Sequence, residues 1–511
     1  MYVQPLLTRP DGLIRKFGLA AGAVAAADAL IYQAYPGLNV GLAAAIVFAL
    51  LILDARTEGR SIDPKSALLL PALSLPALLE NVSFFPVCFT VLSAAAIALS
   101  DRIAWFHAPA DFLKKVFALY VRALLWLCPD AITALRTIPI NQAGASALGW
   151  LVPIVCSVFF IGLFAMANPL LDHLVARLAE VDVDFEPDIL RLFFWVGIMI
   201  MVWPPLRRRF ADTRRPIMQT QPFLDTINLP AAAPTRSLQK ATGHAVVLRS
   251  LFSFNVIFAL QSLSDVIFLV GGAALPTGMS YGDYAHRGAY PLVVAALCAG
   301  LFVVVAIRPG SVTERDPRVR QMVYLWLAQT LLLLVTSLWR LAVYVDIYSL
   351  TYLRVAAFIW MGIVGLGLVW TILRLAFGRS NTWLVNVNVL TVLAVLHGCC
   401  FVDFGAAIAR YNADKALKSA EKPLDLSYMA EIGTAAIPAL DKIAAKTDVP
   451  LAKREQAAQS SVRLRRRHAR ITGDWRAYTF RRFRLSRYIA ENPAPEPSRP
   501  PAQPERERPS P

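Results

Sequence analysis

The sequence has few charged residues for its length, which excludes an ordinary soluble domain. Asp, Glu, Lys and Arg make up 17% of the 511 residues and hydrophobic residues 57%, whereas soluble domains have about 25% charged and about 45–50% apolar residues. The mean hydropathy is +0.51. Apolar runs of about 20 residues, the length that crosses a bilayer, recur along most of the chain. The composition therefore predicts a multi-span membrane protein.

Motifs of the common catalytic sites are also lacking. The chain has no HExxH zinc motif, no P-loop lysine and no GxSxG nucleophile elbow. Six histidines are scattered without the spacing of metal ligands: His107, His173, His244, His286, His397 and His468. We therefore expect a protein that is not an enzyme, with no metal and no cofactor.

Cysteine is scarce and unevenly placed. Five of the six cysteines lie in apolar runs, Cys128 lies in an amphipathic stretch, and the chain after residue 402 has none. Disulfide bonds are therefore not expected in the C-terminal part.

The apolar runs predict an all-α bundle, because lipid tolerates only backbones that satisfy their own hydrogen bonds and these runs do not alternate as barrel strands do. We predict eleven spans: 17–34, 38–53, 66–79, 85–100, 147–167, 189–204, 250–271, 291–307, 322–345, 355–373 and 383–402. The stretch 112–128 is apolar enough to be a twelfth. Because it contains Lys114, Lys115 and Arg122, an interfacial helix is favoured there.

The distribution of basic residues predicts the orientation. With the N-terminus in the cytoplasm, the inner segments hold 25 Lys and Arg and the outer loops hold three, as the positive-inside rule requires. Eleven spans leave the C-terminus in the periplasm of a bacterium. We therefore expect a multi-pass protein of the bacterial inner membrane.

Three regions follow from these patterns: a transmembrane bundle over 1–402, a basic helical module over 403–490 and a proline-rich disordered tail over 491–511. The chain after residue 402 has 21 Lys and Arg against 13 Asp and Glu. Within the module, Leu426, Met429 and Ile432 lie at helical spacing, Gly433 ends that helix, and Pro438 starts another.

Aromatic residues alternate with arginines in DWRAYTFRRFRLSRYIA, residues 474–490. Such a pattern suits nucleic acid, but a periplasmic module meets none. Two interpretations stay open: a helix packed on the module, or docking on anionic lipid headgroups through Arg476, Arg481, Arg482 and Arg484.

Polar residues inside the predicted spans collect in their outer halves. The candidate cluster comprises Asp28, Glu80, Gln261, Asp265, Arg340 and Tyr344. Arg340 and Asp265 lie at matched depths, roughly 8 and 9 Å below the outer ends of their predicted spans at 1.5 Å per residue. Opposite charges at equal depth predict an ion pair, with Tyr344 one turn from Arg340.

A second candidate site is the predicted outer loop 275–291, with Tyr281, Tyr284, His286 and Arg287. Tyrosines suit the headgroup region, so an anchoring role is favoured over recognition of an anionic group.

Four stretches resemble a known family: FALQSLSDVIFLVGGAALPTGMSYGDYAHRGAYPL, SLWRLAVYVDIYSLTYLRVAAFIWM, LDLSYMAEIGTAAIPAL and DWRAYTFRRFRL. They are similar to bacterial multi-pass membrane proteins of the domain of unknown function 4153 and 4173 families, over residues 13 to 488. The resemblance implies a bacterial inner-membrane protein and implies no activity or ligand.

Two functional classes remain open. The polar residues either tie helices together in a structural or interaction protein of the envelope, with lipid and an unidentified envelope protein as partners. Alternatively, they line a site in the outer half of a transporter or channel. A helix break would favour transport, and Pro71, Pro76 and Pro153 are the candidates.

Overall fold

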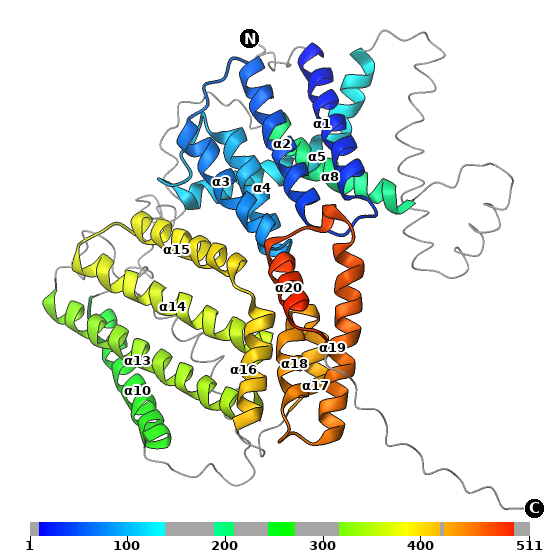
Figure 1. Ribbon diagram of the computed structural model, residues 1–511. Helices are drawn as coiled ribbons and strands as arrows, with labels where there is room; N and C mark the ends of the chain where they lie inside the picture. Colours follow the sequence, from blue (N-terminus) through cyan, green and yellow to red (C-terminus); the bar gives the residue numbers. More distant parts are fainter. Residues whose placement is uncertain (1–9, 138–188, 209–243, 271–315, 419–423, 495–511) are drawn as a thin grey trace, which may run out of the picture. The chain divides into compact units, whose positions relative to one another are not determined.

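The computed structural model describes residues 10–137, 189–208, 244–270, 316–418 and 424–494 (Figure 1). Every regular element in these ranges is a helix, which confirms the predicted all-α class. The chain forms two compact units. Unit 1 comprises Met1–Pro216 and Asp474–Phe480, and unit 2 comprises Ile217–Gly473 and Arg481–Pro511.

Six of the described helices are long and apolar enough to cross a membrane: α2 (Leu38–Thr57), α8 from Leu190 to Arg207, α10 from Val247 to Ser264, α13 (Pro317–Tyr348), α14 (Tyr352–Ala376) and α15 (Asn381–Phe401). Two shorter apolar helices cover 67–80 and 84–99. The chain is therefore a membrane protein. The predicted spans 147–167 and 291–307 lie outside the described residues, so the number eleven stays a prediction.

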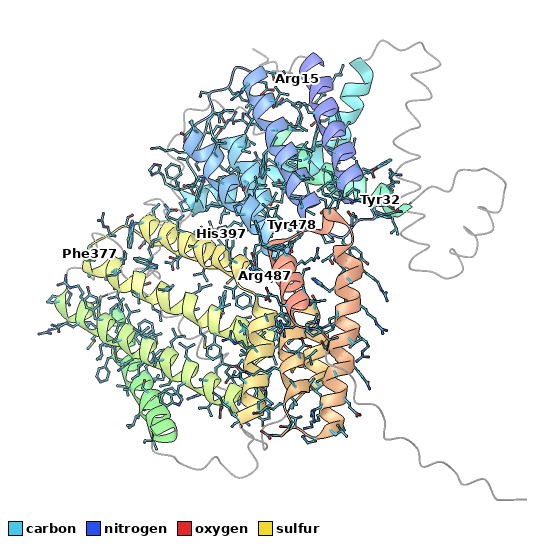
Figure 2. All side chains as sticks on the ribbon, in the orientation of Figure 1. Arg15, Tyr32, Phe377, His397, Tyr478 and Arg487 are labelled. Carbon is cyan, nitrogen blue, oxygen red and sulfur yellow. The ribbon has the colours of Figure 1, made fainter. Side chains whose placement is uncertain are left out.

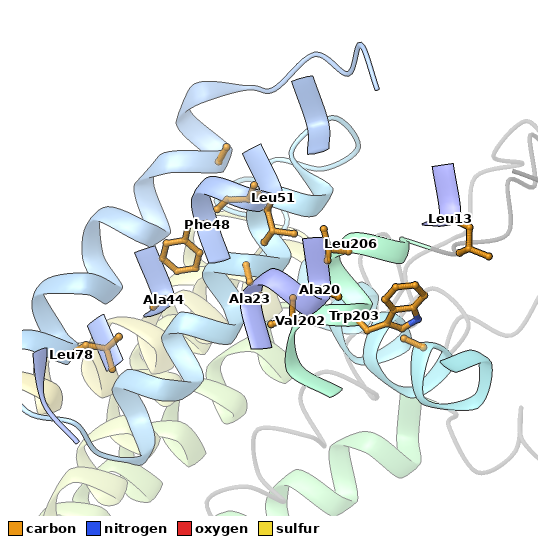
Figure 3. Packing of buried hydrophobic residues seen from close by; sticks show 14 residues of the cluster. Leu13, Ala20, Ala23, Ala44, Phe48, Leu51, Leu78, Val202, Trp203 and Leu206 are labelled. Atoms are coloured by element: carbon orange, nitrogen blue, oxygen red, sulfur yellow. The ribbon is translucent and has the colours of Figure 1, made fainter. Parts of the chain in front are cut away.

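Unit 1 is a bundle with a core rich in small residues. Its helices are α1 (Pro10–Ile31), α2, α3 (Pro64–Glu80), α4 (Phe84–Leu99), α5 (Pro109–Thr137) and α8 (Ile189–Arg207). Figure 3 shows Ala20, Ala23 and Ala44 packed among Phe48 and Trp203. Small side chains let helix backbones approach closely, which matters in lipid because no hydrophobic force drives helices together there.

Helix α3 continues through two prolines, Pro71 and Pro76. The Ser74 hydroxyl accepts a hydrogen bond from the Ser93 hydroxyl of α4, with 2.9 Å between the oxygens, and both side chains are buried. The two prolines do not break α3 into separate helices, and a polar bond ties it to α4. Pro153 lies outside the described residues.

Helix α5 is amphipathic, as its sequence predicts. Phe112, Val116, Leu119 and Ala123 are buried at intervals of three or four residues, whereas Lys114, Lys115 and Arg122 are exposed. The helix is not among the six that meet the length and composition of a span. Its placement at the membrane interface stays a prediction.

Unit 2 contains α10 (His244–Val270), α13, α14 and α15. The Asn255 amide of α10 donates to the Met322 carbonyl of α13 at 3.0 Å, and Phe258, three residues further on, lies against Trp326 with ring centroids 5.7 Å apart. Because the residue numbers of these contacts increase in the same direction along both helices, α10 and α13 run parallel. Helix α13 starts before the predicted span because the Asp316 side chain caps it and Pro317 occupies its first turn.

The C-terminal helices of unit 2 build a core of their own. They are α16 (Phe404–Lys418), α17 (Leu426–Ile432), α18 (Ile437–Ala445), α19 (Leu451–Thr472) and α20 (Phe480–Glu491). Gly433 ends α17 with a φ of +88° and Pro438 lies in the first turn of α18, which confirms the predicted helix–turn–helix. Met429, Ile437 and Leu440 are buried between these helices and α19. Helix α16 runs across the ends of α13, α14 and α15 (Figure 1).

The predicted boundary between residues 402 and 403 falls inside unit 2, between α15 and α16. The separate hydrophobic core of α16–α20 fits a module, and its boundaries remain a prediction. The region 495–511 of the predicted tail lies outside the described residues.

Candidate functional site

Arg340 lies on α13 inside unit 2. Its side chain is buried, with 7% of the residue exposed, and α10, which carries Asp265, runs parallel to α13. Counted from the Asn255–Met322 contact, the Cα atoms of Asp265 and Arg340 are eight residues, or about 12 Å, apart along the helix axes. This offset differs from the equal depths that the sequence predicts, although the long arginine side chain leans towards the N-terminus and spans part of it. The Asp265 side chain lies outside the described residues, so the pair stays a prediction.

Arg374, near the C-terminal end of α14, is a second buried cation of unit 2, with 1% of the residue exposed. The predicted span 355–373 ends one residue before it, but α14 continues to Ala376. A cation in the last turn of a helix interacts favourably with the carbonyl end of the helix dipole.

Asp28 of unit 1 is bound by two residues of α8. Arg191 donates to both carboxylate oxygens of Asp28, from Nε at 2.9 Å and from Nη2 at 2.5 Å, and the Trp195 indole donates at 2.8 Å. The Arg191 guanidinium also lies 5.4 Å from the ring centroid of Tyr32 and 5.5 Å from that of Trp195. A bidentate arginine–carboxylate pair of this kind fixes the two helices in one register.

The candidate polar cluster is divided between the two units. Asp28 and Glu80 belong to unit 1, and Glu80 is buried at the end of α3. Gln261, Asp265, Arg340 and Tyr344 belong to unit 2. A single cluster that joins all six residues therefore remains a prediction.

The densest ion-pair network of the described residues lies at the opposite end of unit 1 from Asp28. Asp54 is fully buried and binds Arg15 Nη2 at 3.0 Å and Arg60 Nη2 at 2.8 Å. Lys16 Nζ binds Glu58 at 2.8 Å and donates to the Leu206 carbonyl at 2.8 Å. Figure 2 shows Arg15 and Tyr32 at the two ends of α1. This network is the main group of polar residues that the sequence analysis missed.

Two further pairs extend the network to the end of α8. Arg207 binds Asp130 of α5 at 2.8 and 3.0 Å, and Arg208 binds Asp101 at 2.5 Å.

Although burial of Glu58 opposes its ionisation, the hydrogen bond and charge of Lys16, with the charges of Arg60 and Arg15, outweigh this effect and lower the pKa of Glu58 below its usual 4.5. Glu58 is therefore ionised and holds these basic side chains in place.

In unit 2, two cations cap the carbonyl end of α13. Lys415 Nζ donates to the Val345 carbonyl at 2.8 Å and to the Asp346 carbonyl. Arg354 donates to the Tyr348 carbonyl at 2.6 Å and to that of Ser349, while its guanidinium lies 4.2 Å from the Tyr344 ring centroid. The last carbonyls of a helix have no partner within it, and cations there are favourable. The sequence predicts Tyr344 one helical turn from Arg340. In the structure the Tyr344 ring lies against the Arg354 guanidinium.

The turn between α13 and α14 is also held by uncharged groups from the C-terminal helices. Asn412 of α16 accepts from the Leu350 amide at 2.7 Å and donates to the Leu350 carbonyl at 2.9 Å. The Tyr428 hydroxyl of α17 accepts from the Tyr352 amide at 3.1 Å. Two stretches that carry the family resemblance, around Arg340–Arg354 and around Leu426–Leu440, therefore meet at this turn.

A third such stretch packs within unit 1. Residues 474–480, which we name the strap, contain a short 3₁₀ helix (Trp475–Ala477) that contacts α2. A Cβ added to Gly37, before α2, would lie 2.4 Å from the Ala477 carbonyl carbon. Ala477 and Thr479 are fully buried. The strap therefore fits closely on the turn between α1 and α2, and only glycine at 37 permits this approach.

The four arginines predicted to meet lipid headgroups differ in their exposure and in their contacts. Arg476 binds Asp474 at 2.9 Å, and Arg481 lies 3.5 Å from Asp403 and donates to the Val402 carbonyl at 3.1 Å. Burial lowers the pKa of Arg482 from its usual range. Of the set only Arg484 is exposed. Helix α20 thus packs on the module through Leu485, Tyr488 and Ile489, and contact of these arginines with headgroups stays a prediction.

The predicted outer-loop site, with Tyr281, Tyr284, His286 and Arg287, lies outside the described residues. The sequence did not identify five residues of these polar sites: Arg191, Trp195, Asp54, Lys16 and Lys415. Arg191 lies two residues inside α8 and Asp28 three residues inside α1, but their positions along the chain do not show that these two helix ends are neighbours. No sequence signal identifies Lys415 either, because its partners are backbone carbonyls.

Residues 19–443 match the family described as Domain of unknown function (DUF4153). The match covers most of the chain, so this multi-span helical membrane protein belongs to that family. No curated protein and no solved structure matches the sequence.

Proposed function

We propose that this chain is a non-enzymatic structural or interaction protein of the bacterial inner membrane. Its transmembrane helices hold the basic module, α16–α20, at the periplasmic ends of unit 2. The module is the platform that an envelope partner contacts.

The docking of the module on the α13–α14 turn carries this proposal. Lys415, Asn412 and Tyr428 bond to the backbone at the end of α13 and in that turn, with distances between 2.7 and 3.1 Å for four of these contacts. Hydrogen bonds from a charged donor each contribute about 1.5–3 kcal/mol, and neutral ones about 0.5–1.5 kcal/mol. These polar groups serve to hold the module rather than to meet a substrate.

The periplasmic side follows from the basic residues. The 25 to three ratio between inner and outer segments supports an outer location for the α13–α14 turn. The strap supports the same side of the membrane. It packs in unit 1 on the α1–α2 turn, which the positive-inside rule also places outside. Two turns predicted on one side thus bind two parts of the C-terminal region.

Contact with anionic headgroups is proposed at Arg484 because of its exposure. It is exposed beside Phe483, which is 53% exposed, on α20. Arg481 of the same helix binds Val402 and Asp403, at the end of α15. An aromatic and an arginine next to the end of a membrane helix suit the headgroup region.

A fusion of alkaline phosphatase, which is active only after export, tests the proposal. A fusion after residue 420 is expected to be active, and one after residue 380, in a predicted inner loop, inactive. An inactive enzyme at 420 with normal protein abundance would place the module in the cytoplasm and refute the proposed periplasmic platform.

A further inference from the structure

A groove runs along the surface of unit 1 between α1 and α8. Its volume is about 450 Å³, within the roughly 300–1,000 Å³ of typical ligand pockets. The lining residues are Ala21, Val24, Ala25, Asp28, Trp195, Val196 and Met199. All but Asp28 and the indole nitrogen of Trp195 are apolar, so the floor of the groove suits a hydrocarbon chain.

One end of the groove is polar and aromatic. Asp28 lies there with Arg191 and Trp195 bound to it, and the Tyr32 ring lies beside Arg191. Asp28 is three residues from the end of α1, and Arg191 is two residues from the start of α8. Tryptophan, tyrosine and arginine near helix ends mark the headgroup level of a membrane.

The apolar floor extends from that level into the hydrocarbon region. Ala21 lies seven residues before Asp28 on α1, which is about 10 Å along the helix axis. Ala21 and Ala25 are exposed on the groove side of α1, and alanine there leaves the space that a larger side chain would fill. The groove is thus oriented as a phospholipid is, with its polar end at the headgroups.

We propose that this groove binds one phospholipid, with an acyl chain along Ala21 and Ala25 and the headgroup at Asp28, Arg191 and Trp195. The Arg191 side chain is 46% exposed and that of Asp28 15% exposed. A phosphate next to Arg191 and an ammonium next to Asp28 would match the two charges in place. The site therefore favours a zwitterionic amine headgroup, because Arg191 and Asp28 together carry no net charge and an anionic headgroup would bring one negative charge without a matching cation.

The proposal adds a lipid site to the structural role proposed above, and it does not depend on the side of the membrane on which the module lies. Failure of the phosphatase test would leave it standing, and its own failure would leave the platform standing. The two can therefore be judged separately.

Native mass spectrometry of the full-length chain tests the site. The protein is released from detergent containing equal amounts of phosphatidylethanolamine and phosphatidylglycerol, and retained lipids are counted. We expect one retained phosphatidylethanolamine, and its loss in Ala25→Leu, which fills the groove. Gly22→Leu is the control, because position 22 is exposed, has no atom within 4 Å of an added Cβ and does not line the groove.

A second measurement locates the lipid acyl chain, and it is needed if Ala25→Leu lowers the abundance of the protein. The fluorescence of Trp195, taken as the difference between the parent and Trp195→Phe, is expected to be quenched by phosphatidylethanolamine brominated on its acyl chain. Equal lipid retention in the parent and in Ala25→Leu would refute the proposal that the groove binds a phospholipid. The absence of Trp195 quenching would refute it as well. Retention of phosphatidylglycerol at or above the level of phosphatidylethanolamine would overturn the headgroup assignment.

Discussion

At the scale of single residues, the buried carboxylate of Asp54 binds defined partners rather than solvent. Asp54 is fully buried and contacts two arginines at 3.0 and 2.8 Å. In a low-dielectric interior such a carboxylate is retained only with its partners, because removal of one leaves an uncompensated charge. These residues therefore contribute to the registry of helices α1 and α2.

His468 predicts an acid-sensitive contact in the module. Burial, with a smaller effect of the nearby Arg482, lowers the pKa of His468 below its usual 6.5, and the ring lies 2.8 Å from the Ser486 hydroxyl of α20. The folded state thus holds His468 neutral while the unfolded chain gains a proton as pH falls below 6.5. The stability that His468 contributes is therefore present above pH 6.5 and declines below it.

We expect faster hydrogen exchange in α20 as pH falls below 6.5, after correction for the intrinsic rate. His468→Gln should remove this pH dependence. His107→Gln, at an exposed position, should leave it intact. Identical pH profiles for the parent and His468→Gln would exclude His468 as the titrating group.

Arg340 and Asp265 supply a second prediction. If they form the ion pair that their sequence positions predict, Arg340→Ala and Asp265→Ala should each cost about 3–5 kcal/mol. The double variant should lose less than the sum, because neither partner then remains unpaired. Thermal stability in detergent measures the three losses, and strictly additive losses would show that the residues are not partners.

At the scale of elements, the ends of helices rather than their midpoints carry the specific contacts. The α1–α2 turn receives the strap, and the α13–α14 turn receives α16 and α17. Helix ends expose unpaired amides and carbonyls, so they are the places where polar side chains from other elements bind. The described membrane helices are joined to one another mainly by apolar and small side chains.

Gly37 provides a test of the strap. A methyl group there would lie 2.4 Å from the Ala477 carbonyl carbon, so Gly37→Ala should displace the strap at a cost of about 1–3 kcal/mol. Trypsin cleavage at Arg476, which lies in the strap, is expected to become several-fold faster.

Gly12→Ala is the matched control, since nothing lies within 4 Å of a Cβ at position 12. Unchanged cleavage at Arg476 in the Gly37→Ala protein would show that the strap does not depend on this close approach.

At the scale of the whole molecule, topology depends on whether α5 crosses the membrane. Its buried residues follow one face and its lysines are exposed, as in a helix that lies in the interface plane. A crossing would also move the basic residues after α8 to the outside, against the positive-inside rule.

Phosphatase fusions after residues 106 and 140 should therefore both be inactive. A fusion after residue 180, in a predicted outer loop, is the active control. Activity at 140 would mean that α5 is a span and would reverse the side assigned to every later segment.

The amino-acid sequence by itself determined the membrane class, the all-helical fold, the family and the approximate positions of the described spans, because hydropathy and helical period are local properties. The α17–α18 pair was also predictable from the sequence, because Gly433 and Pro438 act on their own backbone. Tertiary structure alone decided the partners. Asp28 with Arg191 and Lys415 with the α13 carbonyls join residues 163 and about 70 positions apart. Such pairings depend on how helices pack and turn about their axes, which no local pattern specifies.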